Sequence, residues 1–580
     1  MAPPDQDTNP DDSPSCPAPT PEAAPTPLLG DADGAPKRAA WIALALLCLL
    51  HLLFLTRKGL WNNEFITLGV LGLSWRDVIV ERLRMNHMPG YFLMLKAWTL
   101  VFGTSEAALR LPSALFSLGT VAVTWDLARR AWGGRAAMRA ACLAAAGQNL
   151  LSLSADARMY SSVLFWCVLS MHAYLLLLDR PSWRARAVYV LAGVGGVFVH
   201  LLFAMTFAVQ ALHWLTVRRR AALRARWLLP MMAAPFVVWL PWLATWTNLQ
   251  YKIGRDAWDL PSPGKALREF LRVLWGDYDF DLLPGEASRA LSVPMAVATV
   301  GLVVWAAWRA TRALRRAVPE GKPPGSSGTG SASPSGALAD SFVPWWLLGP
   351  ALFIWLTAFK SDSVIGSQRY YTVAAAAAPI AVARTMDLIR AAAWRRLYMA
   401  SAFGLVFWYG MAWLADPGSG LRQTTRYIQA HAGPDDAIIL SHDGASRRAF
   451  AYYGLGHMRL GAINRGKPGG LANDAWPERL RAEAVRLAEG RHDLWLVLYR
   501  AKRIPLPEAL SAEGSPFESI EVEERPYRRF GECALYHYRL RQPTSGHEAS
   551  GDPIFFMAFD SAQARKEWRD GKAQVRQLGH

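Results

Sequence analysis

The sequence predicts an α-helical protein that crosses a membrane many times and carries a smaller α/β domain near its C-terminal end. Of its 580 residues, 52% are hydrophobic and only 19% are charged. Apolar runs of about 17–25 residues, the length that spans a bilayer, recur along the chain. From residue 416 the composition changes to that of a soluble protein. These three observations exclude a single soluble domain.

The net charge of +17 would also suit a nucleic-acid-binding protein. The basic residues, however, cluster in short loops between apolar runs, where the positive-inside rule places them on the cytoplasmic side. We therefore expect membrane lipid, and no nucleic acid, as a partner. The five cysteines form no CxxC pair, which argues against a structural zinc site or a disulfide framework.

Composition divides the chain into four parts. Residues 1–38, rich in Pro, Ala and Asp, predict a disordered cytoplasmic tail, and residues 546–580 a second tail. Residues 39–415 predict the membrane domain, interrupted at 319–338 by a Gly/Ser/Pro-rich, flexible cytoplasmic linker.

The apolar runs predict about eleven crossings from an N-terminus inside the cell. The stretch 187–217 is counted as two crossings, because arginine clusters flank it on both sides. Two short crossings with a turn near His200 place both arginine clusters on the cytoplasmic side. An odd number of crossings then places the C-terminal domain outside the cytoplasmic (inner) membrane. The predicted spans are 39–56, 107–128, 136–153, 160–178, 187–217 (two), 227–246, 291–310, 342–359, 370–389 and 395–414.

Residues 416–545 predict the extracytoplasmic α/β domain. Residues 437–440 and 494–498 are short apolar runs typical of buried strands, and 419–431 and 476–489 have helical patterns. Strands that alternate with helices favour an α/β arrangement.

Residues 57–106 predict the first outer loop. Ser74 and Asp77 are spaced to begin a helix, whose apolar residues indicate that it lies in the membrane interface. The apolar helix expected over residues 90–102 is too short to cross the hydrocarbon. We expect it to lie along the membrane or to re-enter it.

Ionisable residues gather at the outer ends of the predicted spans, where such groups are functional candidates. Arginine binds phosphate through two parallel hydrogen bonds, and a carboxylate can accept a proton from an attacking hydroxyl. The pattern therefore suits a reaction with a lipid phosphate. The candidates are Asn63, Glu64, His87, Asp156, Arg158, Tyr160, His200 and Arg369.

Several of these residues lie in recognisable motifs. Trp61-Asn62-Asn63-Glu64-Phe65-Ile66-Thr67 resembles the Trp-x-Asp-Glu-x-x-Thr motif of the membrane glycosyltransferases related to protein O-mannosyltransferases and lipid A aminoarabinose transferases. His87-Met88-Pro89-Gly90-Tyr91-Phe92 resembles their His-Pro-Pro-x-Tyr-Tyr, and Leu109-Arg110-Leu111-Pro112-Ser113 their Leu-Arg-Leu-Pro-Ser. Ala157-Arg158-Met159-Tyr160 and Val199-His200 also match. The resemblance runs from about Leu60 to Trp246 and then thins to Arg369-Tyr370.

The resemblance implies a C-type (GT-C) glycosyltransferase fold. Such enzymes move a sugar from a polyprenyl phosphate to a glycolipid, glycan or protein hydroxyl outside the cytoplasmic membrane, with inversion at the anomeric carbon. By this resemblance Glu64, Asn63 and Asp156 are the catalytic candidates. The implied donor-phosphate ligands are Arg158, Arg369, His87, Tyr160 and His200.

The first motif departs from the family at one position, because Asn63 stands where the family has Asp. An amide cannot act as a general base near neutral pH. Either Glu64 acts alone, Asp156 contributes, or the chain is a catalytically degenerate relative that binds or transports a lipid-linked glycan. A transporter proper is disfavoured because the chain shows no repeated halves. No cofactor is expected, and the need for a divalent metal stays open.

Overall fold

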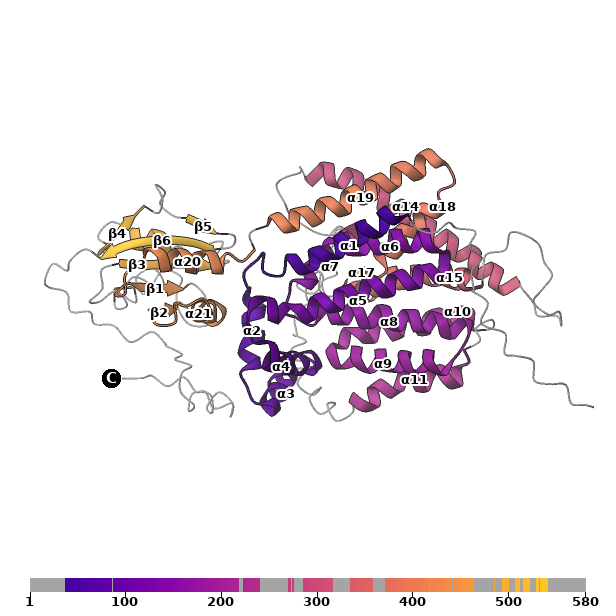
Figure 1. The fold of residues 1–580 in the computed structure, drawn as a ribbon, viewed down its shortest axis with the longest axis horizontal. Helices are drawn as coiled ribbons and strands as arrows, with labels where there is room; N and C mark the ends of the chain where they lie inside the picture. Colours follow the sequence, from indigo (N-terminus) through magenta and orange to yellow (C-terminus); the bar gives the residue numbers. More distant parts are fainter. Residues whose placement is uncertain are drawn as a thin grey trace, which may run out of the picture.

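The computed structural model describes residues 37–85, 87–218, 223–239, 270–272, 274–275, 285–316, 334–357, 371–416, 418–440, 443–462, 484–485, 493–499, 506–511, 515–521, 528–530 and 533–540. A bundle of helices forms the larger part of the molecule, and a smaller domain built on a β-sheet lies beyond one end of it (Figure 1).

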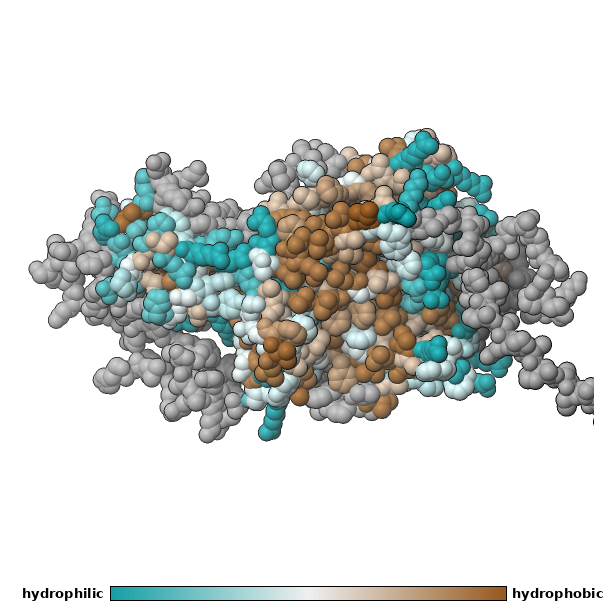
Figure 2. All heavy atoms as spheres, in the orientation of Figure 1, coloured by the Kyte–Doolittle hydropathy of each residue, from teal (hydrophilic) through white to brown (hydrophobic). Residues whose placement is uncertain are grey.

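The bundle exposes a broad hydrophobic surface (Figure 2). Large apolar side chains such as Ile42, Leu46, Leu397 and Phe407 are exposed on its helices. A surface of this kind is typical of a domain that faces lipid. The helices are α1 (Arg38–Leu53), α5 (Glu106–Trp132), α6 (Gly134–Ala146), α7 (Gln148–Ser154), α8 (Tyr160–Asp179), α9 (Trp183–Val199), η1 (Leu201–Phe203), α10 (Ala204–Val217), α11 (Ala225–Trp239), α14 (Gly285–Arg316), α15 (Pro334–Thr357), α17 (Thr372–Ala375), α18 (Ala378–Leu388) and α19 (Ala392–Ala415).

Within the described part of the chain, four helices are long and apolar enough to cross a membrane: α5, α8, the Ala290–Arg315 part of α14, and α19. The mostly helical membrane architecture is therefore present, whereas the number of crossings stays a prediction. The predicted turn near His200 is confirmed, because the chain breaks there between α9 and α10.

The single crossing predicted over residues 136–153 is wrong in one respect. Two helices, α6 and α7, occupy this stretch and meet at Gly147, whose backbone is extended. The 13 residues of α6 rise by only about 20 Å, less than the hydrocarbon thickness. An apolar run in the sequence does not reveal such a break.

The bundle interior contains a fully buried polar network. The His213 ring hydrogen-bonds the Tyr174 hydroxyl at 2.9 Å and the Ser341 hydroxyl at 2.9 Å. Gln210 binds Tyr189 and Ser170. These bonds tie α8, α9, α10 and α15 together and satisfy the buried polar groups.

Three short helices form the first loop: α2 (Asn62–Leu71), α3 (Trp75–Arg84) and α4 (Gly90–Phe102). The Ser74 hydroxyl accepts the Asp77 backbone N–H at 3.1 Å and so begins α3 as predicted. These helices lie at the end of the bundle that faces the sheet domain (Figure 1).

The C-terminal domain contains a six-stranded sheet with the order β2-β1-β3-β6-β4, in which β5 also pairs with β6. β1 is parallel to β2 and β3, whereas β6 is antiparallel to β3, β4 and β5. Both predicted strands are present, as β1 and β3, and the first predicted helix is α20. The helix predicted over 476–489 lies outside the described residues except for 484–485. The elements are α20 (Leu421–His431), β1 (Ala437–Leu440), α21 (Asp443–Tyr452), β2 (Arg459–Ala462), β3 (Asp493–Tyr499), α23 (Leu506–Ser511), β4 (Phe517–Ile520), β5 (Arg528–Phe530) and β6 (Cys533–Leu540).

The sheet domain is docked on the first loop. Ile438 and Trp495, from one face of the sheet, belong to the same buried cluster as Phe65 and Val70 of α2. Arg422 of α20 forms an ion pair with Glu106 at 2.6 Å. The bundle and the sheet domain therefore share one buried hydrophobic cluster where they meet, in addition to the cores of their own, and polar contacts around it.

Candidate functional site

The Glu64 carboxylate is buried in the first turn of α2 and pairs with Arg110 of α5. The Arg110 Nε donates to Glu64 Oε1 at 2.7 Å, and its Nη2 donates to Oε2 at 2.5 Å. The Ala157 N–H donates to Oε1 at 2.8 Å, and the Trp61 N–H donates to Oε2 at 3.1 Å. Since a carboxylate offers about four acceptor sites, Glu64 is fully occupied.

Arg110 is equally saturated. Besides Glu64, it donates to the backbone carbonyls of Leu55 at 2.7 Å, Lys58 at 2.6 Å and Gly59 at 3.2 Å. The pair therefore ties the end of α1, the start of α2 and α5 to the loop before α8. We call Glu64 and Arg110 the loop clamp. Arg110 therefore holds the first loop in place. Glu64, a catalytic candidate in the sequence, lacks the environment of a proton acceptor, because four hydrogen bonds already occupy its acceptor sites.

Asp156 lies in the loop between α7 and α8 and is half-buried. Its Oδ1 accepts the indole N–H of Trp61 at 3.0 Å. Its other oxygen, Oδ2, accepts no hydrogen bond from the described part of the chain. Burial, and next the negative charge of Glu64, raise the pKa of Asp156 above its ordinary value. Asp156 therefore has the environment of a proton acceptor.

Asn63 lies beside the clamp with a half-buried side chain. Its backbone carbonyl accepts the Thr67 hydroxyl at 3.1 Å and, more distantly, Arg158 Nη1 at 3.5 Å. Its amide can donate or accept hydrogen bonds but cannot take a proton.

Arg158 is buried but poorly satisfied. It is 4% exposed, and its Nη1 reaches Thr67 Oγ1 at 3.3 Å. Its Nε has no hydrogen-bond partner among the residues that the structure describes. The guanidinium lies over the Phe92 ring, 5.7 Å from the centroid. A buried guanidinium with an unused N–H donor can bind an anion through a charge-assisted hydrogen bond.

His87, Tyr160 and His200 lie together next to Arg158. The His87 and His200 rings are 6.4 Å apart between centroids, and the Tyr160 and His200 rings are 5.9 Å apart. Gly90 brings α4 and α9 together, because a Cβ there would lie 2.6 Å from the Phe198 carbonyl oxygen. This close approach places the His87 loop beside His200.

His200 is neutral at physiological pH. Burial, and next the positive charge of Arg158, lower the pKa of His200 to about 4. Its Nδ1 accepts the Leu202 N–H at 3.0 Å, so the ring proton is assigned to Nε2. His200 therefore offers a hydrogen-bond donor without a charge.

The structure brings together the predicted residues Asn63, Glu64, Asp156, Arg158, His87, Tyr160 and His200. Arg369 and its neighbour Tyr370 lie outside the described residues, as does Asn86. Sequence reasoning missed Trp61 as the partner of Asp156, although Trp61 belongs to the first motif.

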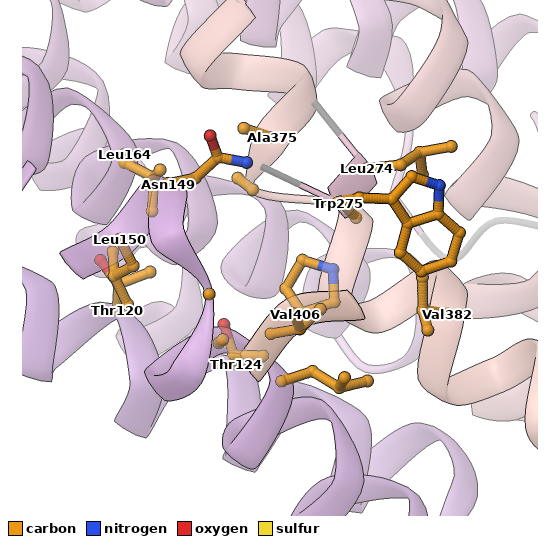
Figure 3. Close-up of a pocket in the computed structure, with 16 residues that line it drawn as sticks. Thr120, Thr124, Asn149, Leu150, Leu164, Leu274, Trp275, Ala375, Val382 and Val406 are labelled. Atoms are coloured by element: carbon orange, nitrogen blue, oxygen red, sulfur yellow. The ribbon is translucent and has the colours of Figure 1, made fainter. Parts of the chain in front are cut away.

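No group of three metal-binding side chains is present in the described ranges. A cavity of about 40 Å³ lies in the bundle and is lined by Thr120, Thr124, Asn149 and apolar side chains that include Trp275 (Figure 3). That volume is enough for roughly three waters. No candidate site residue lines it.

Known proteins provide the context for this geometry. Residues 86–246 match the family described as dolichyl-phosphate-mannose-protein mannosyltransferase. The fold is similar to that of ArnT from Cupriavidus metallidurans in the apo state, with a TM-score of 0.51 and 13% identity over 86% of this chain and 98% of that chain. The structure of the same protein bound to undecaprenyl phosphate gives a TM-score of 0.49 and 14% identity, again over 86% of this chain and 98% of that chain.

The Archaeoglobus fulgidus oligosaccharyltransferase, in its complex with zinc and sulfate, gives a TM-score of 0.41 and 15% identity, over 82% of this chain and 70% of that chain. No curated protein matches the chain. The matched residues contain the motifs from His87 to His200. The loop clamp joins this region, through Arg110, to Glu64 of the first motif. The chain thus has the fold of the C-type membrane glycosyltransferases, and over residues 86–246 it is similar to the dolichyl-phosphate-mannose-protein mannosyltransferases.

Proposed function

We propose that the protein transfers a sugar from a polyprenyl-phosphate donor to an acceptor hydroxyl at the outer face of the cytoplasmic membrane. One observation carries this proposal: a proton acceptor, Asp156, and a buried, under-satisfied arginine, Arg158, belong to the same loop. Inverting transfer needs one group that takes the acceptor proton and one that holds the leaving phosphate.

The reaction is a single displacement. Asp156 takes the proton of the acceptor hydroxyl as its oxygen forms a bond to the anomeric carbon. The bond from that carbon to the phosphate oxygen breaks, and its electron pair stays on the phosphate. Arg158 stabilises that phosphate, while Tyr160 and neutral His200 donate hydrogen bonds to it. Inversion at the anomeric carbon follows, with no covalent intermediate.

In this mechanism Glu64 is a positioning residue that does not contact the substrate. Its bonds to the Ala157 and Trp61 N–H groups fix the backbone beside Asp156 and the indole that binds it. Asn63 is then free to orient the acceptor through its amide. The replacement of the family's Asp by Asn63 therefore need not abolish catalysis, because the proton acceptor lies on another loop.

A degenerate, glycan-binding relative remains the second candidate, supported by Asn63 alone. Purified full-length protein in liposomes, supplied with polyprenyl-phosphate sugars and tested for loss of the donor, separates the two. Mass spectrometry of envelope glycolipids and glycoproteins from a deletion strain identifies the acceptor. Sugar transfer by the wild type that is lost in the Asp156→Asn variant supports the enzyme hypothesis. A donor that binds to the wild type but is never consumed, with unchanged envelope glycans in the deletion strain, supports the binding protein.

The orientation is tested separately. A cysteine placed at the exposed Arg426 of α20 should react with an impermeant thiol reagent from outside the cell. A cysteine at the exposed Arg312, near the end of α14, should react only after the membrane is opened. The reverse pattern would contradict an active site at the outer face.

A further inference from the structure

A second arginine is buried near Arg158. Arg82, in the last turn of α3, is 2% exposed, and its Nε has no hydrogen-bond partner in the described part of the chain. Its acidic neighbour is Glu81, with 3.6 Å between Arg82 Nη2 and Glu81 Oε1, too long for a hydrogen bond. Arg82 is therefore a buried cation whose guanidinium keeps N–H donors that no described residue uses.

Arg82 and Arg158 share one aromatic ring. The Arg82 guanidinium lies 4.9 Å from the Phe92 ring centroid, and that of Arg158 lies 5.7 Å from it. Cation–π contact of this kind holds a guanidinium in place without using its N–H groups. Both arginines keep donors for a ligand.

Arg448 brings a third guanidinium from the sheet domain. It lies against Gly69 of α2, where an added Cβ would be 3.1 Å from the Arg448 Cζ. Burial lowers the pKa of Arg82 to about 10; Glu81 opposes this shift, and the positive charges of Arg158 and Arg448 add to it. Arg82 therefore lies within charge range of both Arg158 and Arg448.

The cluster has an excess of positive charge. Among the described residues, Glu81 is the acid that forms an ion pair with the cluster, and Asp156 lies within charge range of Arg158. Neither Arg158 nor Arg448 forms an ion pair with any residue that the structure describes. Like charges this close are unfavourable unless an anion lies among them. One phosphate at Arg158 would leave Arg82 with Glu81 alone, and would leave the exposed Arg448 without an acidic partner among the described residues.

We propose that Arg82 and Arg448 form a second oxyanion subsite, beside the one at Arg158, which binds a second phosphate of the reacting pair. The proposal rests on the proposed function only for the identity of the first phosphate. The second phosphate belongs either to a donor that carries a diphosphate or to a phosphorylated acceptor. In both cases the sheet domain contributes to substrate recognition through Arg448.

The test is a binding measurement on full-length protein in nanodiscs of neutral phosphatidylcholine. The probes are polyprenyl monophosphate, polyprenyl diphosphate, and phosphatidic acid added over saturating polyprenyl monophosphate. If the donor supplies the second phosphate, the diphosphate binds about tenfold more tightly than the monophosphate, and Arg448→Ala removes this preference. If the acceptor supplies it, phosphatidic acid binds to the saturated protein, and Arg448→Ala weakens that binding about tenfold.

Two controls separate this proposal from the proposed function. Arg426→Ala removes another exposed arginine of the sheet domain and should change nothing. Gly69→Ala should weaken second-phosphate binding in the same direction as Arg448→Ala, because its methyl group displaces the guanidinium.

The second subsite is overturned if Arg448→Ala binds all three probes as the wild type does, or if the wild type shows neither the diphosphate preference nor phosphatidic acid binding. Unchanged monophosphate binding by Arg158→Ala would instead count against the donor site of the proposed function.

Discussion

Arg110 and Arg158 are both buried at the end of the bundle that faces the sheet domain, yet their surroundings differ. Arg110 is saturated by the Glu64 carboxylate and three backbone carbonyls. Arg158 makes two long hydrogen bonds and leaves its Nε unused. A saturated buried cation stabilises the fold, whereas an unsaturated one retains capacity for a ligand. The carboxylates differ in the same way, since Glu64 is fully occupied and Asp156 is not.

The largest expected effect concerns the unsaturated carboxylate. Asp156→Asn keeps the shape of the side chain and removes the proton acceptor, so sugar transfer should fall by about 10²–10⁴-fold with little change in thermal stability. Transfer rates and melting curves of the purified protein measure both quantities. Near-normal transfer would remove Asp156 from the mechanism and weaken the contrast between the two carboxylates.

Substitution in the loop clamp should lower the stability of the fold, which Asp156→Asn should leave almost unchanged. Glu64→Gln leaves Arg110 buried opposite a neutral amide, and loss of one partner of a buried pair costs about 3–5 kcal/mol of folding free energy. A lower melting temperature and a lower yield of folded protein should accompany any loss of transfer. The control is Arg130→Ala, which breaks a partly exposed pair with Asp126 and should melt almost as the wild type does. Unchanged stability of Glu64→Gln combined with lost transfer would restore Glu64 as a catalytic group.

Arg158 should affect donor binding more than stability. Arg158→Lys keeps the charge but loses the planar fork, and Arg158→Ala loses both. We expect binding of polyprenyl monophosphate to weaken by roughly tenfold in the Lys variant and more in the Ala variant. Binding that is unchanged in both variants would contradict the assignment of Arg158 as a phosphate ligand.

The smallest effect is a displaced pH profile. Asp156 accepts a proton only when ionised, and its pKa is raised, so kcat/KM should fall as the pH drops through that raised pKa. The fall should begin at a higher pH than the ordinary Asp value of about 3.9 would give. A profile that stays flat down to the ordinary aspartate range would show that Asp156 is not the base.

The sequence alone was sufficient for the membrane class and the motifs, and it named most of the residues that the fold brings together around Asp156 and Arg158. These properties depend on hydropathy, charge placement and short spacings, which are local in the chain. It also showed that Asn63 replaces the family's acid, and it predicted the break at His200 from the arginines on both sides. The division of α6 from α7 at Gly147 escaped it, because an extended glycine leaves the apolar pattern unchanged.

Only the tertiary structure decided which partners each charged residue has. The partners that saturate Glu64 include Arg110, 46 positions away, and Ala157, 93 positions away, so no local pattern predicts them. The approach of Arg82 and Arg158 to the Phe92 ring, and of Arg448 to Gly69, likewise depends on packing between distant segments. Sequence determines which ionisable groups lie in the loops between the apolar segments. Folding determines which of these groups are already neutralised, because hydrogen bonds and burial are set by contacts between distant segments.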